Sequence, residues 1–521
     1  MLFGRTELQV FLGQTLQSGK LKDPLMMEKF LLLSNPTAMS HKAYPRRYFP
    51  FGSAYIAGQL RATGDFDVKS IDYQWAGVTN ESVAADIRAN GYRYVGVKAY
   101  AVDYLWLIEL VEFLRSEFGD SITIIIGGPI ATFSYDVLLK GSKINFCVLG
   151  EADTTLIDLL ENIDSPQNAA GVAYLDASGK VVRTPGGQYP GKDLDDLAWP
   201  AYNLFNIDQY TPNRPPFPGS EKKFGRKYRT LDFITGRGCP FECSFCGRIS
   251  RKYRKRSVDA IIEEMQYLMQ TYDITHFAIE DELFVQVEDW VAEFCDKVRP
   301  LDIHWRCQSR ARGLTPEVLA MMKSAGCQRI TLGVESGSET ILKSMNKKIT
   351  PDDIRYSVKV CREAGIFPGT ELIIGMPGET EETVRETIDL FQELHLPERE
   401  MAFLQLLPGT PLFYQFLGKT EATATHEKIL RDISADDGTL KTFIHNVSGL
   451  PDDELIRLKN EAEAEMSANF NKYRRQHETV AYYSDVIWQG LSHVKRKVQN
   501  YGSANFIPAV PTNLKQASDH R

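Results

Sequence analysis

Two blocks of alternating strand and helix patterns constrain the fold of this chain more than any other feature of its sequence. In the first block, five short apolar runs have the length and composition of buried strands: residues 29–36, 66–73, 92–100, 122–128 and 143–150. Segments with helical periodicity separate them, and this alternation is typical of a parallel, doubly wound sheet. We therefore predict an α/β domain over residues 27–190, after a polar N-terminal extension over residues 1–26.

A second alternating block follows a turn-rich stretch at residues 176–200, which predicts a domain boundary. Six strand–helix repeats predict a partial (β/α)6 barrel over residues 195–420, with its chemistry at the carboxyl ends of the strands. The remaining residues, 421–521, lack strand patterns, and we expect a mainly helical C-terminal region with a charged helix at 451–476. The six predicted barrel strands lie near residues 231–235, 274–279, 302–307, 328–334, 369–374 and 400–406.

Two helices of the second block carry clear start and stop signals. Ser257 and Thr350 are candidate N-caps, because their hydroxyl groups can accept a hydrogen bond from the first turn. Pro351 follows Thr350 at the first helical position, and Gly365 is placed to end the same helix. These signals predict helices that begin at residues 258 and 351.

The composition of the chain argues against several classes of protein. The 521-residue chain has a net charge of −8, so no overall basic character marks it as a nucleic-acid-binding protein. No apolar run approaches the roughly 18–20 residues needed to span a membrane, and the N-terminus lacks the pattern of a signal peptide. Eight cysteines do not form a disulfide framework in a chain of this length. We therefore expect a cytoplasmic protein without a membrane span.

Three cysteines stand close together at the first strand-to-helix connection of the second block. Cys239, Cys243 and Cys246 have the spacing C-x-x-x-C-x-x-C directly after a predicted strand. Structural zinc usually takes four protein ligands, whereas an iron–sulfur cluster with one open iron needs three thiolates. The spacing therefore favours an iron–sulfur cluster, with zinc as the alternative. The other cysteines of this block occur singly and are expected to be packing residues: Cys295, Cys307, Cys327 and Cys361.

The stretch CPFECSFC resembles the signature of the radical S-adenosylmethionine (SAM) superfamily, including the aromatic Phe245 before the third cysteine. The resemblance implies that Cys239, Cys243 and Cys246 bind a [4Fe–4S] cluster and that SAM occupies its fourth iron. It also implies that an electron from the cluster cleaves SAM to a 5′-deoxyadenosyl radical. A flavodoxin or a ferredoxin is the kind of partner that would donate this electron. The protein itself supplies position and exclusion of water.

Later strands of the block end in stretches that resemble other parts of the same superfamily: FAIEDELF, WRCQSRARGL, RITLGVESGS, ELIIGMPGET and LLPGTPL. The resemblance implies a carboxylate for the SAM ammonium, an arginine for its carboxylate, and further contacts to its ribose and adenine. For the acidic residues, a role at a helix N-terminus is the alternative, and for Arg310 an exposed surface position. The SAM-binding residues implied in this way are Phe245, Glu280, Asp281, Glu282, Arg310, Glu335, Ser336 and Gly375.

The first block resembles the cobalamin-binding domain of one large class of radical SAM enzymes, within a pattern that is flavodoxin-like in general. A Gly-Gly pair after a strand lets a ligand approach the backbone at the carboxyl edge of the sheet. The chain lacks the D-x-H-x-x-G motif, whose histidine ligates cobalt in other cobalamin domains, so a relic domain without the cofactor is the alternative. The cobalamin contacts implied by the resemblance are Gly127, Gly128, Pro129, Thr132, Gly150 and Glu151.

Basic residues surround the cysteine motif at 222–229 and 247–256, against the acidic average of the chain. They could attract an anionic small-molecule substrate, or they could form a solvated surface. Nucleic acid ranks low as a partner. RNA methylthiotransferases of the superfamily carry three further cysteines in their N-terminal domain, whereas this chain has only Cys147 before the motif.

Together, the resemblances imply a cobalamin-dependent radical SAM methyltransferase. Such an enzyme would methylate an unactivated carbon, or a phosphorus centre, of a small metabolite through methylcobalamin. One alternative is a cyclase or oxidoreductase that resembles the anaerobic magnesium-protoporphyrin ester cyclases and transfers no methyl group. A more distant alternative is a zinc-bearing module that binds polyanions.

Overall fold

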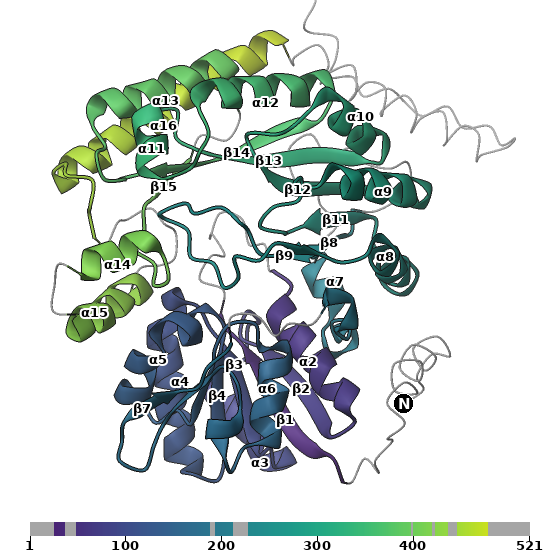
Figure 1. Ribbon diagram of the computed structural model, residues 1–521, viewed down its shortest axis with the longest axis vertical. Coiled ribbons are helices and arrows are strands. Elements are labelled where there is room, and N and C mark those ends of the chain that lie inside the picture. The colour runs from purple at the N-terminus through teal and green to yellow at the C-terminus, as the bar shows by residue number, and fades with distance from the viewer. Residues whose placement is uncertain are drawn as a thin grey trace, which may run out of the picture.

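The computed structural model describes residues 26–36, 48–187, 193–211, 228–396, 400–418, 422–435 and 445–477. Nearly all of the predicted N-terminal extension, most of the basic stretch at 222–229 and the chain after residue 477 lie outside these ranges. Figure 1 shows two α/β lobes stacked along the long axis, the first below the second. Within the described ranges, no helix combines the length and the apolar character needed to cross a membrane.

Sheet A of the first lobe has the strand order β2-β1-β3-β4-β5-β6-β7. Its strands are β1 (Glu28–Ser34), β2 (Phe66–Asp72), β3 (Tyr94–Lys98), β4 (Thr123–Gly127), β5 (Phe146–Val148), β6 (Val172–Leu175) and β7 (Val181–Arg183). The first five run parallel, and between them in sequence lie α2 (Phe51–Thr63), α3 (Asn80–Asn90), α4 (Tyr104–Phe118) and α5 (Pro129–Gly141), with α6 (Ala152–Glu161) after β5.

Both faces of sheet A are covered. Leu31 and Leu33 of β1 pack into one apolar core, whereas Phe30 and Leu32 pack into the other. Successive residues of a strand point to opposite faces, so this division places one core on each side of the sheet. The predicted doubly wound domain is confirmed.

The sequence did not predict β6 and β7, which form an antiparallel hairpin at one edge of sheet A. The Asp176 carboxylate stabilises the turn by accepting hydrogen bonds from the backbone nitrogens of Ser178 at 2.9 Å and Lys180 at 3.0 Å. β7 has three residues and lies inside the stretch expected to be a turn-rich boundary. A strand this short carries no periodicity that distinguishes it from a turn.

Sheet B of the second lobe has six parallel strands in the order β15-β14-β13-β12-β11-β8, which is the predicted half-barrel. They are β8 (Thr230–Phe233), β11 (His276–Ile279), β12 (His304–Arg310), β13 (Cys327–Glu335), β14 (Phe367–Ile374) and β15 (Met401–Phe403). The helices of this lobe are α8 (Val258–Tyr272), α9 (Glu288–Val298), α10 (Pro316–Ser324), α11 (Glu339–Ser344), α12 (Pro351–Glu363) and α13 (Glu381–Leu394). They cover the outer face of the sheet over one large apolar core (Figure 1).

The predicted helix starts are confirmed. The Ser257 hydroxyl accepts a hydrogen bond from the backbone nitrogen of Ala260 at 3.3 Å. Thr350 and Asp353 form a reciprocal capping box, with Pro351 as the first residue of α12. Gly365 follows the end of α12 with a left-handed φ of 71°.

The C-terminal helices contact both lobes. α14 (Pro411–Leu417) follows β15, α15 (Ala422–Ala435) packs along α4 of the first lobe, and α16 (Asp452–His477) packs against α13 of the second. Leu430 of α15 enters the core of the first lobe, whereas Leu455 and Leu458 of α16 enter that of the second. The helix predicted at 451–476 is therefore confirmed.

Candidate functional site

The three predicted cluster ligands lie in one loop, residues 238–253, which we call the cysteine loop. Two short strands, β9 (Gly236–Arg237) and β10 (Arg254–Lys255), pair in antiparallel fashion and close its base. Gly238 has a φ of 84°, and a β-carbon there would collide with the carbonyl oxygen of Lys252. Only glycine therefore fits the position from which the loop turns out of β9.

Backbone contacts fix the middle of the cysteine loop against the second lobe. The nitrogen of Ser244 donates to the carbonyl oxygen of Met345 at 2.9 Å, and the oxygen of Ser244 accepts from the nitrogen of Leu412 at 2.9 Å. The side-chain amide of Asn346 donates to the carbonyl oxygen of Glu242 at 2.7 Å. The loop is thus tied to the end of α11 and the start of α14.

Two arginines surround the thiols of the loop. Nη1 of Arg310 lies 3.9 Å from Sγ of the buried Cys243, and the guanidinium also covers the ring of Phe241 at 3.8 Å. Burial raises the pKa of Cys239 and raises that of Cys246 to about 11, whereas the nearby charge of Arg248 lowers both. Because thiols must lose their protons to bind a metal, these cations favour the ligating form.

The cysteine loop contains a hydrogen-bond donor that suits a negatively charged cluster. Nε of Arg248 is buried and has no hydrogen-bond partner within the described part of the chain. In the same part of the chain, no three His, Cys, Asp or Glu side chains form a group that could hold a single metal ion. A cuboidal cluster differs from a single ion, because each thiolate binds its own iron. The cysteine loop can therefore hold such a cluster, with an orphaned donor beside it.

The three acidic residues after β11 have different surroundings. Glu280 forms an ion pair with Arg306 and accepts a hydrogen bond from Gln308 at 3.1 Å. Glu282 lies beside the cysteine loop: burial raises the pKa of its carboxyl group, while the backbone N–H of Gly238 and the charge of Arg248 lower it. Glu282 therefore lies beside the predicted cluster ligands, whereas Glu280 is paired with two side chains of β12.

Asp281 differs from its two neighbours, because its carboxylate supports the base of the cysteine loop. It accepts hydrogen bonds from the backbone nitrogen of Thr235 at 2.7 Å and from Nζ of Lys255 at 2.6 Å. Its side chain is 2% exposed and that of Lys255 is 7% exposed. The buried pair joins β10 to the segment after β11, and the bond from Thr235 adds the segment after β8, so Asp281 makes structural contacts at the position predicted to bind the SAM ammonium.

The remaining predicted SAM residues also differ in their surroundings: some lie beside the cysteine loop, and others make contacts elsewhere. Glu335 has a left-handed φ of 66° at the end of β13 and pairs with Lys347 at 2.7 Å. Lys347 also lies 5.6 Å from the ring centre of Phe245, so these residues meet beside the cysteine loop. Gly375 turns the chain after β14 with a φ of 100°. Ser336 is buried and hydrogen-bonded to Thr387 of α13 at 3.1 Å, which directs its hydroxyl toward that helix.

Polar residues line the inner face of the half-barrel, and the sequence analysis missed most of them. Arg329 of β13 extends its guanidinium over Gly369 of β14, where any β-carbon would collide with it. Glu371 stands two residues further along β14, on the same face, beside Glu335. A charged residue within the apolar run FPGTELII was the available signal.

Glu371 should reduce the stability of the fold at neutral pH. The residue is exposed to solvent, yet partial desolvation by the surrounding protein raises its carboxyl pKa, and the charge of Glu335 raises it further. A raised carboxyl pKa in the folded state makes the stability contribution of the residue less favourable as pH rises through that pKa. Because solvent screens an exposed charge, we expect Glu371→Gln to raise Tm by only about 1 °C at pH 8, and the difference should vanish below about pH 4.

The matched control for this measurement is Glu393→Gln. Hydrogen bonds from Arg355 lower the pKa of Glu393, so its replacement should leave Tm unchanged or slightly lower at pH 8. An equal or lower Tm for Glu371→Gln at pH 8 would contradict the assignment of Glu371 as a destabilising charge.

The predicted cobalamin contacts gather at the carboxyl edge of sheet A. Gly128 has a φ of 88° between β4 and α5, and a β-carbon on Gly127 would meet no atom within 4 Å. The hydroxyl of Thr132 accepts from the nitrogen of Gly150 at 2.9 Å and donates to the carbonyl oxygen of Gly128 at 3.1 Å. With Pro129 as the first residue of α5, these residues form a bare backbone surface that a flat cofactor can approach.

Glu151, the sixth predicted contact, turns toward the other lobe. Its carboxylate pairs with Arg254 and lies 3.3 Å from Nη1 of Arg237. Asp153 pairs with the same Arg237 at 2.6 Å. All four side chains have low exposure, at most 19%. These residues form an inter-lobe ion-pair cluster (Glu151, Asp153, Arg237 and Arg254) that joins the edge of sheet A to the base of the cysteine loop.

The basic stretch at 247–256 is therefore largely paired with carboxylates. Arg254 pairs with Glu151, Lys255 with Asp281 and Arg256 with the fully buried Glu264. Arg251 is exposed and pairs with Glu242 at 2.8 Å. Neither predicted use of these charges, a site for an anionic substrate or a solvated surface, describes the three buried cations.

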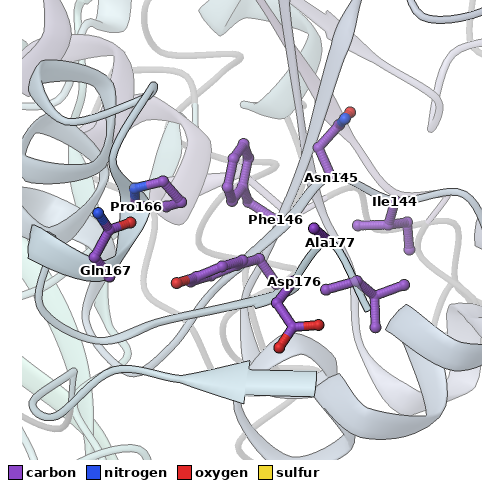
Figure 2. A pocket seen from close by; sticks show the side chains of 9 residues that line it. Ile144, Asn145, Phe146, Pro166, Gln167, Asp176 and Ala177 are labelled. Carbon is purple, nitrogen blue, oxygen red and sulfur yellow. The ribbon is translucent and has the colours of Figure 1, made fainter. Parts of the chain in front are cut away.

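A surface pocket lies away from these residues, at the amino end of β5 and beside the β6–β7 hairpin. Figure 2 shows Phe146, Asn145 and Asp176 around it. No predicted site residue lines it, and it opens at the end of β5 opposite Gly150. The lining residues are Ile144, Asn145, Phe146, Pro166, Gln167, Tyr174, Leu175, Asp176 and Ala177.

Comparison with known proteins matches both lobes to families. Residues 233–391 match the radical SAM superfamily, and residues 43–160 match the B12 binding domain. An uncharacterized methyltransferase of Pyrococcus horikoshii is 27% identical over 70% of this chain and 77% of its own length. The anaerobic magnesium-protoporphyrin IX monomethyl ester cyclase of Rubrivivax gelatinosus is 26% identical over 71% and 67%. The cytidylyl-2-hydroxyethylphosphonate methyltransferase of Streptomyces wedmorensis is 24% identical over 88% and 92%.

A solved structure shares the fold of both lobes. It is the radical SAM methyltransferase TsrM of Kitasatospora setae with cobalamin and a [4Fe–4S] cluster bound, at a TM-score of 0.59 and 20% identity over 75% of each chain. Radical SAM domains use SAM and a [4Fe–4S] cluster, and B12-binding domains take cobalamin, so these are the cofactors that the two lobes imply. Because both matches fall in the order of the two lobes, the chain belongs to the radical SAM enzymes that carry a B12-binding domain.

Proposed function

We propose that this enzyme transfers a methyl group to a small molecule with the help of cobalamin. The contact between the edge of sheet A and the cysteine loop carries the proposal. Glu151 follows Gly150 at that edge and contacts Arg237, which stands two residues before Cys239. A reaction that needs a cofactor from each lobe makes use of such an interface. Methyl transfer that combines radical chemistry with cobalamin is a reaction of this kind.

Within this proposal, Cys239, Cys243 and Cys246 ligate the [4Fe–4S] cluster, and SAM binds its open iron. When bound, these cofactors supply a radical for hydrogen abstraction and a methyl group for transfer. Arg310 positions Cys243 by a contact of 3.9 Å between Nη1 and Sγ. The carboxylates of Glu280 and Glu282 accept hydrogen bonds from the SAM ammonium.

Other residues of the second lobe position SAM. The pair of Glu335 and Lys347, together with Phe245, contacts the nucleoside part, and the turn at Gly375 accommodates the adenine. Asp281 acts through Lys255, because their buried pair holds the base of the cysteine loop in place. The sequence resemblance and the position of these residues at the carboxyl ends of the strands support these roles.

In the first lobe, we propose that Gly127, Gly128, Pro129, Thr132 and Gly150 contact cobalamin. The space at Gly127 supports this assignment, since a β-carbon there would meet no atom within 4 Å. The domain lacks a D-x-H-x-x-G motif, and in the proposed site cobalt takes no histidine from it.

The proposed partners are a small-molecule substrate and an electron donor such as a flavodoxin or a ferredoxin. The name of the Streptomyces wedmorensis relative, a methyltransferase of a phosphonate nucleotide, supports a small-molecule substrate. None of the eight cysteines, all of which lie in the described ranges, forms a disulfide, which supports a reducing compartment.

The test is anaerobic purification with cobalamin, followed by incubation with a reductant, a metabolite extract and SAM deuterated in its methyl group. We expect 5′-deoxyadenosine, S-adenosylhomocysteine and a small molecule that carries the labelled methyl group, all detected by mass spectrometry. Formation of 5′-deoxyadenosine together with an unlabelled, cyclised product would contradict methyl transfer and support the cyclase alternative. Absence of 5′-deoxyadenosine would refute both.

A further inference from the structure

We propose that Arg248 raises the reduction potential of the [4Fe–4S] cluster by donating a hydrogen bond from Nε to one of its sulfur atoms. The proposal rests on the cluster assignment in the proposed function and adds a residue to it that no sequence resemblance indicated. Arg248 stands two residues after Cys246 in the cysteine loop.

The position of the guanidinium is the first argument. Nη1 lies 3.4 Å from the carbonyl oxygen of Cys239, so the side chain reaches back across the loop from the third cysteine to the first. Its charge acts on the thiols of Cys239 and Cys246 and on the carboxyl group of Glu282. Arg248 is therefore in the midst of the proposed ligands and not at the outer rim of the loop.

The second argument is that one N–H group of Arg248 has no hydrogen-bond acceptor in the described ranges. Nε of Arg248 is buried and has no hydrogen-bond partner in the described ranges, and no carboxylate there forms an ion pair with this residue. Nearby basic residues differ, because Arg251, Lys255 and Arg256 each pair with a carboxylate. A buried N–H without an acceptor is costly. An acceptor that arrives with a cofactor, such as a cluster sulfide or a thiolate, would satisfy it.

The electrostatic consequence follows from the charge of the cluster. Reduction adds one negative charge, and a fixed cation with an N–H directed at sulfur stabilises the reduced form more than the oxidised form. We expect removal of this charge to lower the ratio of reduced to oxidised cluster about tenfold at a fixed ambient potential. For a one-electron couple this is a shift of about 59 mV.

The experiment compares Arg248→Gln with Arg251→Gln in the full chain, reconstituted without SAM under anoxia. Both replacements remove one positive charge from the same loop, but Arg251 is exposed and paired with Glu242. The electron paramagnetic resonance signal of the reduced cluster is followed against the ambient potential. We expect the tenfold change for Arg248→Gln and less than a twofold change for Arg251→Gln. Equal shifts for the two variants, or no shift for Arg248→Gln, would overturn the proposal.

If Arg248→Gln does not assemble its cluster, a second pair of variants tests the same proposal. Arg248→Lys and Arg248→Met have similar length and differ by one charge, so the methionine variant should have the lower potential. A raised KM for SAM at an unchanged potential would identify Arg248 as a SAM ligand and overturn the proposal. The outcome is separable from the proposed function: a shifted potential without methylated product refutes methyl transfer alone, whereas methylated product with unshifted potentials refutes the role of Arg248 alone.

Discussion

Replacing Cys243 with alanine is expected to abolish assembly of the [4Fe–4S] cluster and cleavage of SAM. The thiol is buried at the centre of the cysteine loop, where Arg310 lies 3.9 Å from its sulfur. With two thiolates the cluster loses the ligand that a third iron needs. Iron and sulfide content, the visible absorption of the reconstituted protein and the yield of 5′-deoxyadenosine measure the effect.

The matched control is Cys361→Ala, a second buried cysteine in the same lobe. Cys361 lies in the apolar core between sheet B and its helices, so its loss should cost about 1 kcal/mol of stability through packing and leave the cluster intact. Retention of a full cluster and of SAM cleavage in Cys243→Ala would eliminate the radical SAM mechanism for this loop. Stoichiometric zinc in place of iron in the anaerobically purified protein would do the same.

Replacing Asp281 with asparagine is expected to lower the free energy of unfolding by about 3–5 kcal/mol, because it leaves the buried ammonium of Lys255 without its counter-charge. Burial alone lowers the pKa of Lys255, and Asp281 is the main group that opposes this effect. Lys255 also lies 4.2 Å from the ring centre of Trp290, so it has little room to move toward solvent. Denaturant unfolding of the anaerobic protein measures the loss.

Glu242→Gln is the control, since it breaks the exposed pair with Arg251 and should cost no more than about 1 kcal/mol. The same variants separate a structural role for Asp281 from the direct contact with SAM that the sequence predicted. A structural role predicts a lower cluster content with an unchanged KM for SAM in the molecules that retain a cluster. A raised KM at unchanged stability would restore the sequence prediction.

The parallel strands and the order of the two lobes were predictable, because buried parallel strands are continuous apolar runs between amphipathic helices. Polar interactions between the two lobes were not predictable from the sequence. Glu151 follows a Gly at a strand end and therefore looks like a ligand contact, yet its partners Arg237 and Arg254 lie about a hundred residues further along the chain. A sequence shows that such a carboxylate stands at the edge of a sheet, but not which cation faces it.

For the basic stretch at 247–256, too, the sequence did not show which groups its charges would contact. Its charges indicated either an anionic ligand or a solvated surface, and the sequence contained no sign that Arg256 would meet Glu264 of α8 in the protein interior. Ser336 and Asp281 were likewise predicted from a resemblance in the stretches that follow two of the strands. That position fixes the place of the backbone, whereas the neighbouring helix or hairpin decides where the side chain points.

The inter-lobe ion-pair cluster has a consequence for any attempt to divide the enzyme. Two carboxylates belong to one half of the chain and two guanidinium groups to the other, and all four side chains have low exposure. Separately expressed halves would each carry a patch of uncompensated like charge, and the first half would also expose the apolar surface that Leu430 of α15 now covers. Recombination of the halves, and not study of either alone, would be the informative experiment.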